Sequence, residues 1–159
     1  MPSAMPSARS VSEALRRAER LLRACGYSSH ATTKDFVAWL QTDTPYPNPT
    51  PHALLENPFL VVHEIVEIEE VKRRGLRITR DVIVRNLKAV DIAHARAAEV
   101  ELEVAKVHGA FDHLRERLED VRGWSLDPVV TPAQKKRYRS LYRKTKAALD
   151  GLARASGEP

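Results

Sequence analysis

The stretch NPFLVVHEIVEIEEVKRRGLRITRDVIVRNLKAVDIAHAR, residues 57–96, decides the fold. Its first part predicts a helix over residues 58–74. Asn57 can cap this helix because its side chain accepts hydrogen bonds from free backbone amides, and Pro58 suits the first helical position. Gly75 can adopt the left-handed conformation that ends a helix. Apolar side chains point in nearly every direction around the segment, which is typical of a helix buried on most sides.

Polar side chains stand within this apolar helix. His63, Glu67 and Glu70 lie within roughly 60° of one another around the helix axis. A carboxylate in such surroundings must be paired, protonated or bound to a metal ion, because desolvating a lone charge costs too much free energy. We therefore expect these residues to belong to a buried site.

A second helix is predicted over residues 80–121, with Thr79 as its N-cap. One stripe of this helix is apolar except for His94, and Glu101 continues the stripe after seven residues. Asp91 borders the stripe and precedes His94 by one helical turn. An imidazole and a carboxylate therefore lie where the core should be.

The two helices should bring their polar residues to the same level. At 1.5 Å per residue, His63 lies about 18 Å before Gly75, and Asp91 and His94 lie about 18 and 22 Å after Thr79. A connection of about five residues makes the helices antiparallel neighbours. We therefore predict that His63 meets Asp91 and His94.

Imidazoles and carboxylates without a thiolate favour zinc, manganese, iron or magnesium. We expect His63, Glu67, Asp91 and His94 as the ligands of such a divalent metal ion. Glu64 would then act as a base on metal-bound water. This chemistry suits a hydrolase of phosphoesters or nucleotides.

The later part of the second helix is less regular. Gly109 predicts a kink, because glycine in a helix interior costs about 1 kcal/mol relative to alanine. His108 continues the stripe of His94, and His108 with Asp112 forms a second candidate ligand pair.

A family resemblance rests on the motif His63-Glu64-x-x-Glu67, followed some thirty residues later by a helix that bears His94. This pattern resembles small uncharacterised all-helical microbial families built around His-Glu-x-x-Glu. The resemblance covers about residues 57–100. It implies an all-helical fold and a bound metal.

The pattern is also similar to that of HD-type phosphohydrolases, which gather a distant histidine, an adjacent His-Asp pair and a later aspartate around a metal. This resemblance implies either His30 or His52 as the distant histidine and Asp91 as the later aspartate. The adjacent pair would be His63-Glu64, with glutamate in place of aspartate.

The rest of the chain predicts an all-α, single-domain helical bundle over residues 10–155, between a disordered tail (1–9) and a short tail (156–159). Ser10 and Glu13 form a capping box for the first helix. A short helix is expected at about residues 34–40, capped by Thr32 or Thr33.

The segment TDTPYPNPTP, residues 42–51, has prolines at alternate positions and excludes a helix. We expect an ordered strap that packs Tyr46 over the domain. Residues 123–128 predict a turn. Thr131-Pro132 predicts the start of the last helix.

Composition places this chain of 159 residues among globular proteins, with 43% hydrophobic and 30% charged residues. The single cysteine, Cys25, excludes an internal disulfide and a cysteine-based zinc site. No segment matches a signal peptide or a membrane span, so we expect a cytoplasmic protein without a membrane partner. A homo-oligomer is an open alternative, because the helix over residues 58–74 could need more cover than one chain provides.

Positive charge is concentrated at the C-terminal end. Residues 131–159 contain eight Lys and Arg against Asp150 and Glu158, a balance of +6, whereas the whole chain carries +5. A cationic helix with interleaved tyrosines can contact the phosphates of a nucleic acid. The candidate contact residues are Lys135, Lys136, Arg137, Arg139, Arg143 and Lys144.

Three hypotheses follow from these patterns. The chain could be a metal-dependent hydrolase that acts through the residues around His63. It could be a nucleic-acid-binding or scaffold protein, whose buried histidine and glutamates form a satisfied polar network. It could also be a helical bundle that holds a metal for stability alone.

Overall fold

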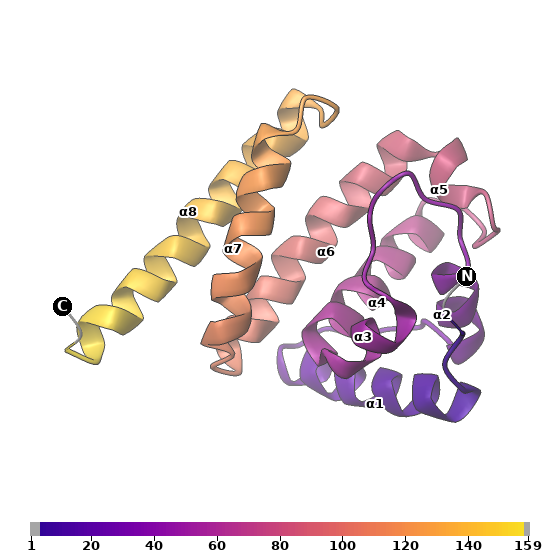
Figure 1. The fold of residues 1–159 in the computed structure, drawn as a ribbon, viewed down its shortest axis with the longest axis horizontal. Coiled ribbons are helices and arrows are strands. Elements are labelled where there is room, and N and C mark those ends of the chain that lie inside the picture. The colour runs from indigo at the N-terminus through magenta and orange to yellow at the C-terminus, as the bar shows by residue number, and fades with distance from the viewer. Residues whose placement is uncertain (1–3, 158–159) are drawn as a thin grey trace. The chain divides into compact units, whose positions relative to one another are not determined.

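Residues 4–157 are described in the computed structural model, and every regular element among them is an α-helix (Figure 1). The all-α fold class predicted from the sequence is therefore confirmed. The helices are α1 (Ala8–Ala24), α2 (Thr33–Leu40), α3 (Pro51–Glu56), α4 (Pro58–Arg73), α5 (Val82–Arg85), α6 (Leu87–Val107), α7 (Phe111–Leu126) and α8 (Pro132–Ala155).

The described residues belong to two compact units, with the boundary between Glu101 and Leu102. In the first unit, α1 packs on α2, α3 and α4, and both α2 and α3 also pack on α4. In the second unit, α7 packs along α8. The single domain predicted over residues 10–155 stays a prediction.

Helix α4 is the centre of the first unit, and its sequence signals are confirmed. The side chain of Asn57 accepts hydrogen bonds from the backbone N–H groups of Phe59 and Leu60 at 3.0 and 3.3 Å. Gly75 has a φ of 78°, the left-handed conformation expected after the last turn. No residue from Pro58 to Val71 is exposed, as expected for a helix covered on most sides.

The long second helix predicted over residues 80–121 is instead three helices. Asn86 separates α5 from α6, and its side-chain amide donates to the carbonyl of Val82 at 2.8 Å. Gly109 has a φ of 69° and ends α6. The predicted kink at Gly109 is therefore wrong, because this glycine adopts the left-handed conformation that stops a helix.

Two other boundaries differ from the prediction. Ser7 rather than Ser10 caps α1, because the Ser7 hydroxyl accepts a hydrogen bond from the Ser10 backbone N–H at 3.1 Å. The predicted turn at residues 123–128 is helical as far as Leu126. Trp124 thus lies in α7, where its ring packs against that of Tyr138 with centroids 5.5 Å apart.

Two helix starts agree closely with the sequence. Thr32 and Asp35 form a capping box at α2, and Thr131 caps α8 with Pro132 in its first turn. The predicted tails are tested only in part, because residues 1–3 and 158–159 lie outside the described residues. Of the N-terminal tail, Ala8 and Arg9 belong to α1.

Hydrogen bonds from two of its residues attach the proline-rich strap, residues 42–51, to later parts of the chain. The backbone N–H of Asp43 donates to the carbonyl of Arg80 at 2.7 Å, and the Tyr46 hydroxyl donates to Asp91 at 3.3 Å. The strap therefore crosses from α2 to α3 with contacts to α6 and to the segment before α5. Within the described part of the chain, no helix has both the length and the apolar character needed to cross a membrane.

Candidate metal centre

Helix α4 places three candidate ligands on adjoining turns. His63, Glu64 and Glu67 each offer one ligand atom, and these atoms all lie within 4.8 Å of one another. His63 and Glu67 are four residues apart, so they share one side of the helix. The close group therefore arises from local helix geometry.

His63 is enclosed between two carboxylates. Its Nδ1 lies 2.7 Å from Oε2 of Glu101, and its Nε2 lies 3.4 Å from Oε2 of Glu67. His63 and Glu67 are 4% and 6% exposed, and Glu101 is fully buried. Burial alone would lower the pKa of His63, but hydrogen bonds to Glu101 and Glu67 outweigh it and raise that pKa to about 10. Without a metal, the imidazole therefore carries a proton.

The spacing of the ligand atoms suits a small cation. Donor atoms about 2.1 Å from a common ion lie roughly 3.0–3.4 Å from one another in octahedral or tetrahedral sites. The 3.4 Å between Nε2 of His63 and Oε2 of Glu67 meets this requirement. The ligand atom of Glu64 lies within 4.8 Å of the other two, so its carboxylate would complete the group by moving toward them.

Glu64 differs from the other two residues because it is only half-buried. Its Oε2 accepts a hydrogen bond from Nε1 of Trp39, on α2, at 2.6 Å. Burial, together with the negative charge of Glu67, raises the pKa of Glu64 to about 7, although His63 and Trp39 act in the opposite direction. This carboxyl group therefore changes its charge near neutral pH.

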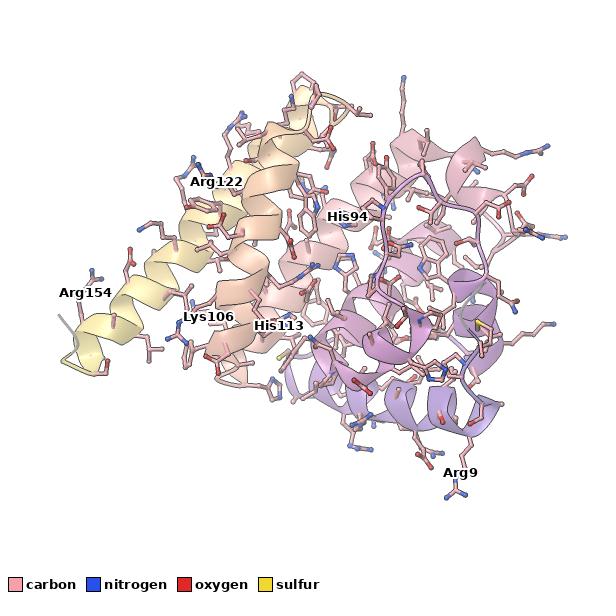
Figure 2. All side chains as sticks on the ribbon, viewed as in Figure 1. Arg9, His94, Lys106, His113, Arg122 and Arg154 are labelled. Carbon is pink, nitrogen blue, oxygen red and sulfur yellow. The ribbon has the colours of Figure 1, made fainter. Side chains whose placement is uncertain are left out.

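The structure brings His94 to the same place but leaves Asp91 at the strap. The rings of His63 and His94 meet edge to face, with centroids 4.8 Å apart and an interplanar angle of 65°. Figure 2 shows His94 on α6. Asp91 accepts the hydrogen bond from Tyr46. Neither His94 nor Asp91 is a member of the close group of three ligand atoms among the described residues.

Sequence reasoning missed two contributors to this network. Glu101 is the partner of His63, and Trp39 is the partner of Glu64. The signal for Glu101 was present, since this carboxylate lies seven residues after His94 on the same apolar stripe. The sequence gives no comparable indication for Trp39, because an indole in a short apolar helix is normally interpreted as a core residue.

The other histidines considered from the sequence lie at the surface. His52 is exposed, and the side chain of His30 is 84% exposed, with its Nδ1 3.7 Å from Glu69. His108 is exposed after the last turn of α6, with its Nδ1 2.9 Å from the carbonyl oxygen of Val104. Gly109 separates His108 from Asp112, which belongs to α7.

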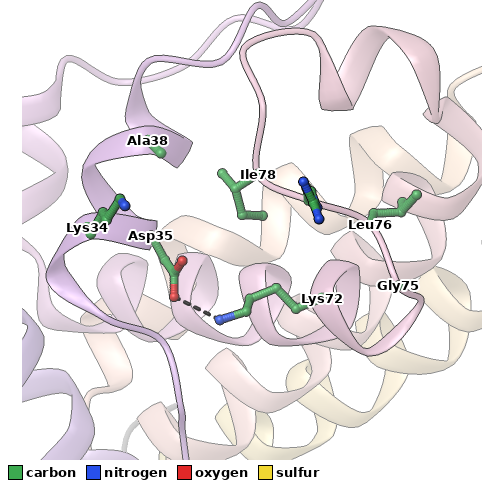
Figure 3. Close-up of a pocket in the computed structure, with 8 residues that line it drawn as sticks. Lys34, Asp35, Ala38, Lys72, Gly75, Leu76 and Ile78 are labelled. Carbon is green, nitrogen blue, oxygen red and sulfur yellow. Dashed lines mark hydrogen bonds and ion pairs between the residues drawn. The ribbon is translucent and has the colours of Figure 1, made fainter.

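The first unit also contains an open groove of about 370 Å³, which is separate from the candidate metal ligands (Figure 3). An ion pair between Lys72 and Asp35, 2.9 Å long, lies within it. Partial burial would raise the pKa of Asp35, but Lys72 and the hydrogen bonds with Thr32 outweigh it and lower that pKa. The lining residues are Lys34, Asp35, Ala38, Lys72, Gly75, Leu76, Arg77 and Ile78.

The candidate nucleic-acid residues all lie on α8. Lys136, Arg139, Arg143 and Lys144 are exposed, whereas Lys135 and Arg137 are half-buried. Tyr138 is only 3% exposed and packs on Trp124, so its ring is not available to a base.

Comparisons with protein-family models, with curated proteins and with solved structures found no match to this chain.

Proposed function

We propose that this chain binds a divalent metal ion through Nε2 of His63 and the carboxylates of Glu64 and Glu67. The observation that supports this proposal most strongly is the close group of three ligand atoms, with the other ring nitrogen of His63 on Glu101. Histidines that bind metals usually donate their second N–H to a carboxylate, which orients the ring and fixes its tautomer. Glu101 is suited to that role.

The charge of the network also favours a cation. Three carboxylates, those of Glu64, Glu67 and Glu101, surround or adjoin one imidazole. In the metal-free protein, a proton on His63 compensates part of their negative charge. A divalent ion would replace that proton and supply a larger positive charge. The nitrogen and oxygen ligands suit zinc, manganese, iron or magnesium.

Metal binding can be tested on untagged protein. Elemental analysis of the purified chain should show a divalent metal, and calorimetric titration of the metal-depleted chain with manganese or zinc should show one site. Glu67→Gln should weaken binding roughly 10–100-fold or more, because it removes a ligand charge. Glu70→Gln is the matched control, since Glu70 lies on the same helix but pairs with Arg73 and Arg74.

Hydrolysis of phosphoesters or nucleotides is the activity that this centre supports best. A metal ion lowers the pKa of bound water, and Glu64 could accept the proton of that water. Partial exposure and a pKa of about 7 suit Glu64 to this role at neutral pH. Phosphatase and phosphodiesterase substrates should be screened with manganese and magnesium.

Glu64→Gln separates the two uses of this carboxylate. Loss of metal together with activity would assign Glu64 as a ligand, whereas loss of activity with the metal retained would assign it as the base. The proposal would be overturned if the purified chain contains no metal and the metal-depleted chain binds none. Calorimetric titrations with metal would then be the same for Glu67→Gln and the native sequence. The histidine and its glutamates would then form a structural network.

A further inference from the structure

A second and independent feature is the outer face of α8. Cations recur along it once per turn, opposite the buried residues Tyr138, Leu141 and Thr145. At 1.5 Å per residue the row spans about 16 Å from its first to its last lysine. We name this row the α8 stripe; it comprises the exposed residues Lys136, Arg139, Arg143 and Lys146, with the half-buried Lys135 at its edge.

The α8 stripe is barely neutralised. Among the described residues, Lys136, Arg139 and Arg143 form no ion pair, and Lys146 pairs with Asp150 at 3.1 Å. The neighbouring helix α7 behaves differently, because each of its arginines contacts a carboxylate three residues away. Those pairs are Arg115 with Asp112, Arg117 with Asp120, and Arg122 with Glu119.

This arrangement reduces the stability of the helix. Like charges four residues apart, such as Lys135 with Arg139 and Arg139 with Arg143, repel each other and destabilise the helix. The first turn of α8 also contains no acidic residue to complement the positive end of the helix dipole. Solvation alone does not require that all charges on one face have the same sign. A bound polyanion would compensate the repulsion between them.

We propose that the α8 stripe binds the phosphate backbone of a nucleic acid without sequence specificity. Regular cations on one straight helix match a linear array of phosphates, and the counterions released on binding provide the driving force. An anionic membrane is a poorer partner, because a membrane-bound helix inserts an apolar face and the apolar face of α8 is buried. The proposal does not depend on the metal centre.

Filter binding with a mixed-sequence DNA duplex of roughly 20 base pairs tests this proposal on the full chain, from about 50 to 200 mM salt. The native chain should bind, and its affinity should fall steeply as salt rises. Replacing Lys136, Arg139 and Arg143 together with glutamine should reduce affinity roughly tenfold or more at low salt. It should also reduce the slope of log K against log salt by about 2–3, since each phosphate contact contributes about 0.9.

The matched control replaces Arg16, Arg17 and Arg20 with glutamine. These arginines are exposed on α1, so the control removes the same charge from the other unit. It should retain most of the affinity and the native slope. Circular dichroism should show both triple variants folded, because all six residues are exposed.

Three results would overturn the proposal. One is no binding of the duplex by the native chain at the lowest salt concentration. Another is an equal loss of affinity in the α1 and α8 variants, which would mean that net charge alone is responsible. The last is equal or tighter binding to polyglutamate or to phosphatidylserine vesicles, which would assign the stripe to an acidic protein or to a membrane surface.

Discussion

The network around His63 and the α8 stripe are both rich in charge, but they differ in how that charge is compensated. His63 is buried and has a carboxylate at each ring nitrogen. Arg139 and Arg143 on the α8 stripe are exposed and form no ion pair among the described residues. Burial makes compensation obligatory because a desolvated lone charge is too costly, whereas water and salt can screen an exposed charge.

Substitutions in the two regions should therefore affect different properties of the protein. Altering the network around His63 should change the free energy of unfolding and the response to metals. Altering the α8 stripe should mainly change the affinity for a polyanion and should affect stability less.

Removing Glu101 should have the largest effect on stability. Glu101→Ala leaves the buried imidazole of His63 without its closest partner, and breaking such a pair costs about 3–5 kcal/mol. The free energy of unfolding from urea denaturation of metal-depleted protein measures this loss. Glu13→Ala, which removes an exposed partner of Arg9, should cost less than about 1 kcal/mol. Equal losses would mean that the buried pair contributes no more to stability than an exposed ion pair does.

Raising the pH should destabilise the metal-free protein by on the order of a few kcal/mol. The pKa of His63 is raised from 6.5 to about 10, so its contribution is complete below pH 6.5 and is lost as the pH rises through 10. The pKa of Glu64 is raised from 4.5 to about 7, so the loss of stability already begins as the pH rises from 4.5 to 7. Denaturation at a series of pH values should show a steady decline, and Glu101→Ala should flatten its alkaline part.

A bound metal should stabilise the protein more at higher pH, opposite to the decline expected without metal. Its ligands must lose their protons, so stabilisation by manganese or zinc should increase from about pH 6 to pH 8. With free metal at about 100 times its Kd, the gain should be about 2.7 kcal/mol. Thermal denaturation with and without metal measures it. A gain that is the same at both pH values, or that persists in Glu67→Gln, would contradict binding at His63 and Glu67.

Charge reversal on the second unit should change the free energy of unfolding least. On α8 the reversal should stabilise the protein, which few surface substitutions do. Arg139→Glu replaces two repulsive pairs, with Lys135 and Arg143, by attractive ones and should stabilise the protein by about 0.8–2 kcal/mol. Arg115→Glu on α7 should instead destabilise it by about 0.4–1 kcal/mol, because the attraction between Arg115 and Asp112 becomes a repulsion. Urea denaturation should show these opposite signs. The same sign in both variants would remove the contrast between the two helices.

Local signals predicted much of the fold. The pairs Asn57-Pro58 and Thr131-Pro132 begin helices as expected, because cap and proline act within one turn. The kink predicted at Gly109 is wrong because a glycine can either bend a helix or end it, and only the conformation of the folded chain decides. Asn86 was missed for a similar reason, since its side chain satisfies the carbonyl of the turn that it breaks.

The sequence predicted the candidate site in part. Counting residues from the turn placed His63 level with His94, and their rings are in contact. On an unbroken helix from Thr79, Glu101 would lie about 15 Å beyond His63, but the break at Asn86 invalidates that count. Glu101 is the partner, and Asp91 turns to Tyr46. Metal binding by these residues stays a prediction.

Trp39 has a further consequence, because its indole gives the network an optical reporter. The indole is 5% exposed and donates to Glu64, whereas the other tryptophan, Trp124, packs against Tyr138 in the second unit. Replacing Trp124 with phenylalanine would leave one emitter, whose fluorescence depends on the charge of the carboxylate beside it. Proton loss or ion uptake at Glu64 would then become visible as a change in emission, in a chain with no attached dye.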